Sequence, residues 1–238
     1  MTTVILTAHG SRDPRSAANT HAIAGHLRRV APEFDVRVAF CEHSTPNLRD
    51  VLGTVTGDAV VVPFLLTSAY HARIDIPALI ADSGVPVRLA AALGEDGRLV
   101  GVLGERLRAA GVSRFDSGLG VVAVAVGSSN TAANARTACV AARLTHGTRW
   151  TGVEVAFATG PTPSVPAAVE RLRERGATRL VIAPWFLAHG RITDRIADYA
   201  RRAGIVMAEP LGAHRLVAAT VLDRVEAVLT RSVAVAAA

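Results

Sequence analysis

The sequence contains one internal repeat, and this duplication limits the possible folds more than any other feature. Matching groups of residues occur in the same order in the two halves, which predicts two copies of one structural unit. The boundary is expected in the Gly- and Ser-containing segment 112–120, so that the domains are residues 1–115 and 116–238. The matched groups are Gly10-Ser11 with Gly127-Ser128, Phe40-x5-Pro46 with Phe157-x5-Pro163, Pro63-Phe64-x-Leu66 with Pro184-Trp185-x-Leu187, and Leu93-Gly94 and Glu105-Arg106 with Leu211-Gly212 and Asp223-Arg224.

Short apolar runs alternate with helical patterns through the first copy. A helix is expected to begin at Asp13-Pro14, a good N-cap and first-turn pair, and to end before Pro32. Strands that alternate with helices predict a parallel sheet covered on both faces. We therefore predict two similar α/β domains of the doubly wound kind. The other expected elements are strands at 4–6, 36–40, 59–62 and 87–93 and helices at 46–52, 74–81 and 99–110.

Composition favours a cytoplasmic enzyme over a membrane or exported protein. Half of the 238 residues are hydrophobic and few are aromatic, which suits α/β packing. The apolar runs are far shorter than the ~20 residues of a membrane span, and the N-terminus lacks the basic region of a signal peptide. Cys41 and Cys139 have neither metal-binding nor disulfide spacing. No membrane partner is expected.

The net charge of +6 comes from arginine, because the chain contains no lysine. The planar fork of arginine grips carboxylates and phosphates, so an anionic partner is one explanation. A coding bias that replaces lysine by arginine throughout is the other, and charge balance alone does not decide between them. No basic run is interleaved with aromatic residues, so a nucleic-acid partner is not expected.

Three polar residues of the first half follow successive expected strands. His9 follows the first strand, Glu42 follows the second, and His71 lies in the loop after the third. The carboxyl ends of parallel strands meet at one edge of a sheet, where such folds bind ligands. Two imidazoles and a carboxylate suit a divalent ion such as iron, cobalt, nickel or zinc, and they can accept protons near neutral pH. Taken singly, each could instead be an ordinary loop residue: a hydrogen-bonding His9, a Glu42 that caps the next helix, or an exposed His71.

The second copy lacks this trio of residues. Loss of all three together is expected if they act as a unit. One segment of the second half, which begins at Ala188-His189, resembles the segment around His9, but it lies after the third strand of its copy. The role of His189 therefore stays open. At the positions of the trio, the second copy has Val126, Thr159 and either Arg191 or Ile192.

Two motifs of the first half resemble those of the sirohydrochlorin chelatases, the CbiX/SirB group of class II chelatases. These motifs are LTAHGSR at 6–12 and PFLLTSAYHARIDIP at 63–77. The second-half segment 184–196 resembles the degenerate half of the long, two-domain members. The resemblance implies two chelatase-like domains that face each other across a cleft, with the active site carried by the N-terminal domain.

The resemblance also implies a lyase-type enzyme that inserts a divalent metal into sirohydrochlorin, a polycarboxylate tetrapyrrole, for sirohaem biosynthesis. In the family the motif histidines handle the metal; they match His9 and His71, and an acidic residue matches Glu42. These three are expected to be both the catalytic residues and the metal ligands. The metal is a substrate, with Fe²⁺ favoured over Co²⁺, and no permanently bound cofactor is expected. The residues expected at the substrate carboxylates are Ser11, Arg12 and Arg73.

Other functions fit parts of the same pattern. A cobaltochelatase of cobalamin biosynthesis, or a non-enzymatic carrier of metal or tetrapyrrole, would use the same residues. A nucleotide-dependent enzyme is disfavoured, because the Gly10-Ser11 turn lacks the remainder of a phosphate-binding loop. Ser11 is a poor nucleophile candidate, since no G-x-S-x-G elbow surrounds it. Because the duplication could replace a homodimer of single domains, a monomer or weak dimer is expected.

Overall fold

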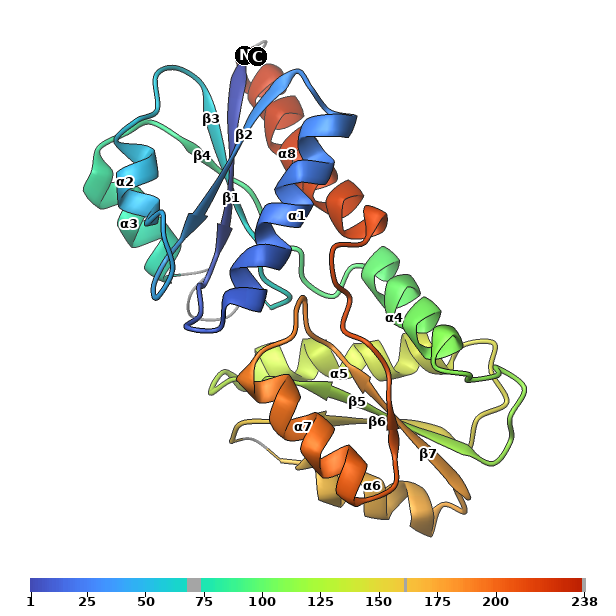
Figure 1. Ribbon diagram of the computed structural model, residues 1–238. Helices are drawn as coiled ribbons and strands as arrows, with labels where there is room; N and C mark the ends of the chain where they lie inside the picture. Colours follow the sequence, from blue (N-terminus) through green and yellow to red (C-terminus); the bar gives the residue numbers. More distant parts are fainter. Residues whose placement is uncertain (68–73, 161, 237–238) are drawn as a thin grey trace. The chain divides into compact units, whose positions relative to one another are not determined.

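The computed structural model describes residues 1–67, 74–160 and 162–236 and divides into two compact α/β units (Figure 1). Unit 1 consists of Met1–Gly94 with Ala213–Ala238, and unit 2 is Glu95–Gly212. Each unit contains a parallel four-stranded sheet with helices on both faces, which confirms the predicted fold class. No helix among the described residues is long and apolar enough to cross a membrane.

Unit 1 holds the elements predicted for the first copy, except the helix expected at 99–110, together with the last helix of the chain. Its elements are β1 (Thr2–Ala8), α1 (Pro14–Val30), β2 (Phe34–Phe40), α2 (Leu48–Leu52), β3 (Ala59–Pro63), α3 (Ile76–Ser83), β4 (Arg88–Leu89) and α8 (Arg215–Ala236). The strand order is β2-β1-β3-β4, and all neighbours are parallel. Since β1 lies between β2 and β3, the loops that follow these strands leave from the same edge of the sheet.

Unit 2 repeats this arrangement. Its elements are α4 (Gly97–Ala109), β5 (Leu119–Ala125), α5 (Thr131–Thr145), β6 (Gly152–Phe157), α6 (Val165–Glu174), β7 (Arg179–Pro184), α7 (Arg191–Arg202) and β8 (Val206–Met207). The strand order β6-β5-β7-β8 is that of unit 1, with β5 in the place of β1. The internal repeat is therefore a repeat of topology.

Helices cover the two faces of each sheet in equivalent pairs. In unit 1, α1 packs with α8 on one face, and α2 packs with α3 on the other (Figure 1). In unit 2, α5 packs with α4, while α6 packs against β5 and β6 and α7 against β8. Strand residues alternate between the two cores, so Ile5 and Val61 are buried with Leu52 and Ile76 on the α2/α3 face.

The two units do not coincide with the two halves of the sequence. α4 follows the first copy along the chain but packs against α5 and β7 of unit 2, and α8 follows the second copy but packs against α1 and β3 of unit 1. The expected boundary near residue 115 separates the sequence repeats, whereas the chain passes between compact units at Gly94–Glu95 and again at Gly212–Ala213. Local sequence patterns could not reveal this exchange, because either sheet buries the same apolar helix face.

Local signals at the start of α1 are confirmed. The Asp13 carboxylate caps the helix by accepting a hydrogen bond from the backbone N–H of Arg15, at 3.1 Å, and Pro14 occupies the first helical turn. The helix ends at Val30, before Pro32, as predicted.

The fourth strand is shorter than predicted, because the chain leaves the sheet edge early. β4 pairs with β3 only through Arg88 and Leu89, although the expected strand ran to residue 93. The carbonyl groups of Ala92 and Leu93 instead accept hydrogen bonds from the Arg224 guanidinium of α8, at 3.2 and 2.9 Å. These carbonyls are therefore satisfied without a longer strand.

Candidate functional site

The loops that follow β1 and β2 are joined by backbone hydrogen bonds at the carboxyl edge of the unit 1 sheet. The N–H of Cys41 donates to the carbonyl of Ala8 at 3.0 Å, and the N–H of Glu42 donates to the carbonyl of His9 at 2.9 Å. Backbone hydrogen bonds thus continue to join the two segments beyond Ala8 and Phe40, where the strand pairing ends. It fixes the backbones of His9 and Glu42, two of the predicted site residues, against each other.

Gly10 makes this close approach possible. It has φ +94°, in the left-handed region, and a Cβ atom there would lie 1.7 Å from the Glu42 carbonyl oxygen. Only glycine fits both the backbone conformation and the space. The Gly10-Ser11 pair therefore has a structural role at this turn.

A second link joins the same loops through Ser44. Its hydroxyl accepts the N–H of Ser11 at 3.1 Å and donates to the Ser11 carbonyl at 2.9 Å. The Ser11 hydroxyl in turn accepts the N–H of Asp13 at 3.0 Å, which leads the chain into α1. Ser11 was predicted to bind substrate; in the structure its polar groups organise the loop, and substrate contact stays a prediction.

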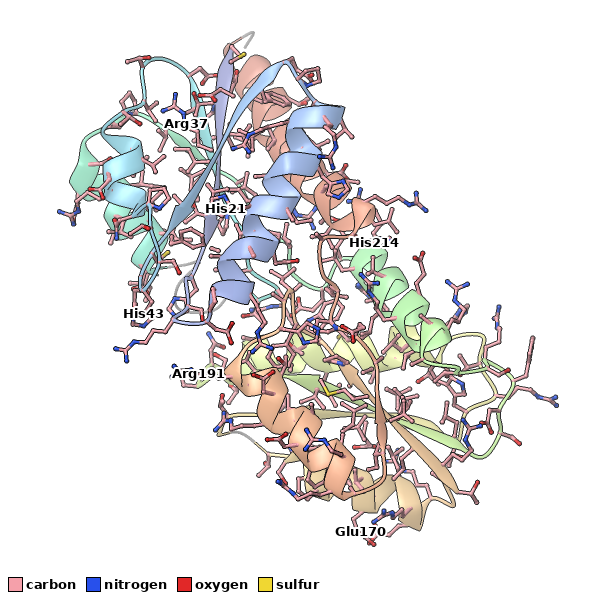
Figure 2. The ribbon with its side chains drawn as sticks, viewed as in Figure 1. His21, Arg37, His43, Glu170, Arg191 and His214 are labelled. Carbon is pink, nitrogen blue, oxygen red and sulfur yellow. The ribbon has the colours of Figure 1, made fainter. Side chains whose placement is uncertain are left out.

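The side chains of Glu42 and His43 lie next to each other at this edge. His43 Nε2 lies 3.3 Å from Glu42 Oε2, and both side chains are nearly half exposed. The partly buried His9 ring faces the His43 ring edge-on, with 6.3 Å between centroids. Figure 2 shows His43 in the loop beyond the carboxyl end of β2. The structure thus brings a second imidazole to His9 and Glu42, one that the sequence analysis missed.

Cys41 lies beside the site but belongs to the core. Its side chain is buried on the α2/α3 face of the sheet. Burial, followed by the negative charges of Asp75 and Glu42, raises the pKa of Cys41 to about 11. Cys41 is therefore a neutral thiol at neutral pH, a poor metal ligand. Cys41 belongs to the same core cluster as Ile76, the first residue of α3.

The remaining predicted residues of the first half contribute less to the described site. Arg12 is exposed in the loop after β1. His71 and Arg73 lie outside the described residues, so their roles stay predictions. Within the part of the chain that the structure describes, no group of three or more His, Cys, Asp or Glu side chains is placed to hold a metal ion. The predicted set of three ligands thus depends on His71.

Comparison with known proteins identifies the family of the chain. The CbiX family model matches residues 3–110 and again residues 120–228, which together make up most of the chain. The chain belongs to the CbiX family. The double match confirms that the sequence repeat joins two CbiX-like copies, and the resemblance identified from the two motifs is correct.

Relatives of this CbiX-family chain include a protein of Priestia megaterium named sirohydrochlorin cobaltochelatase. It is 26% identical over 217 residues, which are 85% of this chain and 69% of the relative. Among solved structures, SirB from Bacillus subtilis with Fe³⁺ superposes with a TM-score of 0.79 at 21% identity, covering 94% of each chain. The sirohydrochlorin chelatase SirB from Bacillus subtilis subspecies spizizenii in complex with cobalt gives 0.74 at 20% identity, with 94% of each chain covered. These structures share the fold.

The second CbiX-like copy keeps the backbone arrangement of these loops but has no ionisable side chain at the positions of His9, Glu42 and His43. The N–H of Thr159 donates to the carbonyl of Val126 at 2.9 Å, as Glu42 does to His9 in the first copy. His189, whose role the sequence left open, lies in unit 2 and pairs with Glu209 at 2.6 Å. The described residues of unit 2 therefore keep this backbone arrangement but have Val126 and Thr159 at the positions of His9 and Glu42.

Proposed function

We propose that this protein inserts a divalent metal ion into sirohydrochlorin. The observation that carries the proposal is the fixed pair of His9 and Glu42 at the carboxyl edge of the unit 1 sheet, in a chain whose two halves both match CbiX. The named relative and matched structures are consistent with this activity, since one is called a sirohydrochlorin cobaltochelatase and another a sirohydrochlorin chelatase.

Metal insertion makes two demands that suit imidazole and carboxylate side chains. Water must leave the incoming ion, and two pyrrole N–H protons must leave the macrocycle. A neutral imidazole nitrogen can hold an ion or accept a proton, but one lone pair cannot do both at once. We assign His9 and His71 to present the ion to one face of the ring and to receive the protons. Glu42 balances charge or ligates the ion.

An incomplete ligand set favours transfer over storage. A closed tetrahedral site would retain the ion, whereas a site with few protein ligands and open positions can release it to the macrocycle nitrogens. The half exposure of Glu42 suits such an open position. General-base assistance by the histidines is worth ~10²- to 10⁴-fold in rate.

The metal is Fe²⁺ or Co²⁺ in this proposal. Two imidazoles and a carboxylate accept either ion, and availability decides between them in a cell. The ring carboxylates of sirohydrochlorin are anionic, and we assign the exposed Arg12, together with Arg73 and Ser11, to their recognition.

The test is a chelation assay with purified protein, sirohydrochlorin and either Fe²⁺ or Co²⁺, followed through the absorbance of the metallated product. We expect catalysis above the spontaneous rate, and a loss of most of it in His9→Ala and His71→Ala. His189→Ala should retain most of the rate. A protein that binds both substrates but gives no acceleration with either ion would be a carrier, and the enzymatic proposal would then be wrong.

A further inference from the structure

His43 occupies a backbone position where the fold favours glycine. Its φ is +59°, which makes it the only non-glycine residue with positive φ among the described residues. The matching residue of the second copy is Gly160, which has φ +91°. The same kink therefore occurs in both loops, and only the first copy places a side chain on it.

The two loops are equivalent around this position. Phe40 N–H donates to the Pro46 carbonyl at 3.0 Å in the first, and Phe157 N–H donates to the Pro163 carbonyl at 2.9 Å in the second. A left-handed conformation is unfavourable for a residue with a side chain, because Cβ comes close to the backbone. The loop can form with glycine at this position, as Gly160 shows. The unfavourable conformation of His43 is therefore not needed for the fold, which suggests a function for its imidazole.

The contacts of the His43 imidazole point to a metal ion. Two donor atoms that are each about 2.1 Å from one tetrahedral ion lie about 3.4 Å apart. The 3.3 Å between His43 Nε2 and Glu42 Oε2 is close to this separation. The two side chains could therefore bind one ion without moving apart. Their near-half exposure leaves room for water ligands on that ion.

The position of His9 indicates where an ion bound by Glu42 and His43 could move next. The His9 ring is more buried than that of His43 and faces it across 6.3 Å between centroids. An ion held by the exposed pair would lie on the solvent side of the His9 imidazole. It could exchange water for the His9 nitrogen over a short path, and a partly hydrated ion exchanges ligands readily.

We propose that His43 and Glu42 form a loading site that takes up the divalent metal ion from solvent and passes it to His9. This inference rests on the proposed function, and it makes His43 a metal-binding residue in addition to the predicted trio. The ion is ligated by one imidazole, one carboxylate and water at this stage. No bond other than metal–ligand bonds forms or breaks.

The test measures Co²⁺ binding by calorimetry on untagged protein without tetrapyrrole, and the KM for Co²⁺ with it. The variants are His43→Gly, which installs the residue of the second copy, and His43→Asn, which also tolerates positive φ and can hydrogen-bond Glu42. We expect both to weaken Co²⁺ binding about 10-fold and to raise the KM for the metal similarly, with a smaller change in kcat. His146→Ala, at the exposed C-cap of α5 in unit 2, is the control that leaves Co²⁺ binding unchanged.

Distinct results overturn the proposal. Wild-type Co²⁺ affinity in His43→Gly would show that the imidazole holds no metal. Restored affinity in His43→Asn alone would mean that His43 only orients Glu42. If the wild type binds Co²⁺ through His43 but does not turn over sirohydrochlorin, the proposed function fails and the loading site stands. If both variants turn over sirohydrochlorin with an unchanged KM for Co²⁺, the proposed function stands and the loading site is wrong.

Discussion

At the scale of single residues, the candidate site depends on where the backbone allows two loops to meet. Gly10 brings the loop after β1 against the carbonyl of Glu42, and His43 holds a conformation that its counterpart Gly160 adopts without strain. Both positions have positive φ, but one lacks a side chain because there is no room, and the other carries one at a cost.

Substitution of Gly10 should separate these two effects. Gly10→Ala is expected to lower the free energy of unfolding by about 2 kcal/mol or more. The new Cβ would clash with the Glu42 carbonyl, and alanine would also have to adopt an unfavourable positive φ. Gly57→Ala is the matched control, since Gly57 has φ +102° but nothing within 4 Å of its Cβ position. Urea denaturation measures both, and equal losses would contradict the steric explanation.

The buried thiol of Cys41 should make stability depend on pH in the alkaline range. Its pKa is raised from 9.0 to about 11 in the folded protein, so the unfolded chain loses its proton first as pH rises. The contribution of Cys41 to stability is complete below pH 9 and falls between about pH 9 and pH 11. Urea midpoints at pH 8, 9 and 10 should fall less in Cys41→Ala than in the wild type.

The exposed Cys139 provides the comparison for that experiment. Cys139→Ala should keep the full alkaline loss of stability, because this thiol is accessible in both folded and unfolded states. A Cys41→Ala variant with the wild-type pH dependence would show that other groups cause the loss.

At the scale of elements, the two loops after β1 and β2 act as one structure. Backbone bonds join Glu42 to His9, and the Ser44 hydroxyl both accepts from and donates to the backbone of Ser11. The side chains at the site are thus positioned by backbone hydrogen bonds and by the Ser44 hydroxyl, a group with no assigned part in the chemistry.

Removal of the Ser44 hydroxyl should loosen this link. Ser44→Ala leaves the N–H and carbonyl of Ser11 without their partner, which costs about 1–2 kcal/mol of unfolding free energy. We also expect weaker Co²⁺ binding, because the segment that carries Glu42 and His43 loses an anchor. Calorimetry and urea denaturation check both effects. Ser44→Thr keeps the hydroxyl and should retain most of both, and an equal loss in Ser44→Thr would point to side-chain size instead.

Sequence patterns predicted these elements and the edge they share, but not every residue of the site. The strand-then-polar pattern placed His9 and Glu42 correctly, because register in a parallel sheet brings strand ends together. His43 was missed, since a histidine beside a glutamate has no recognisable spacing of its own. The signal was present in the repeat: Gly160 marks a position where a side chain is costly.

At the scale of the whole molecule, reciprocal placement of α4 and α8 is the main feature that sequence patterns could not predict. In each helix an arginine donates hydrogen bonds to backbone carbonyls of its unit, just before a glycine with positive φ. Arg224 of α8 bonds to the carbonyls of Ala92 and Leu93, and Arg106 of α4 bonds to that of Leu211 at 2.8 Å. The repeat predicted that these arginines are equivalent, but periodicity carries no information on which sheet a helix covers.

Loss of either arginine should weaken one unit more than the other. Arg224→Ala is expected to lower stability by about 1–3 kcal/mol and to speed hydrogen exchange in β1 and β3, which lie in the unit that α8 covers. Arg106→Ala should instead affect β5 and β7. Arg201→Ala, in an exposed pair with Asp198, is the control and should change little. Equal hydrogen exchange in both units for each variant would contradict the reciprocal placement of the helices.

The double passage of the chain between units has a consequence for how such a protein could arise. A single-copy precursor with the same element order would end in a helix whose apolar face covers the sheet of a second, identical molecule. Two such molecules could complete each other only if each provided its last helix to the other. Fusing the genes end to end keeps that mutual completion within one polypeptide, so one copy can lose its reactive side chains while the other still relies on it for shape.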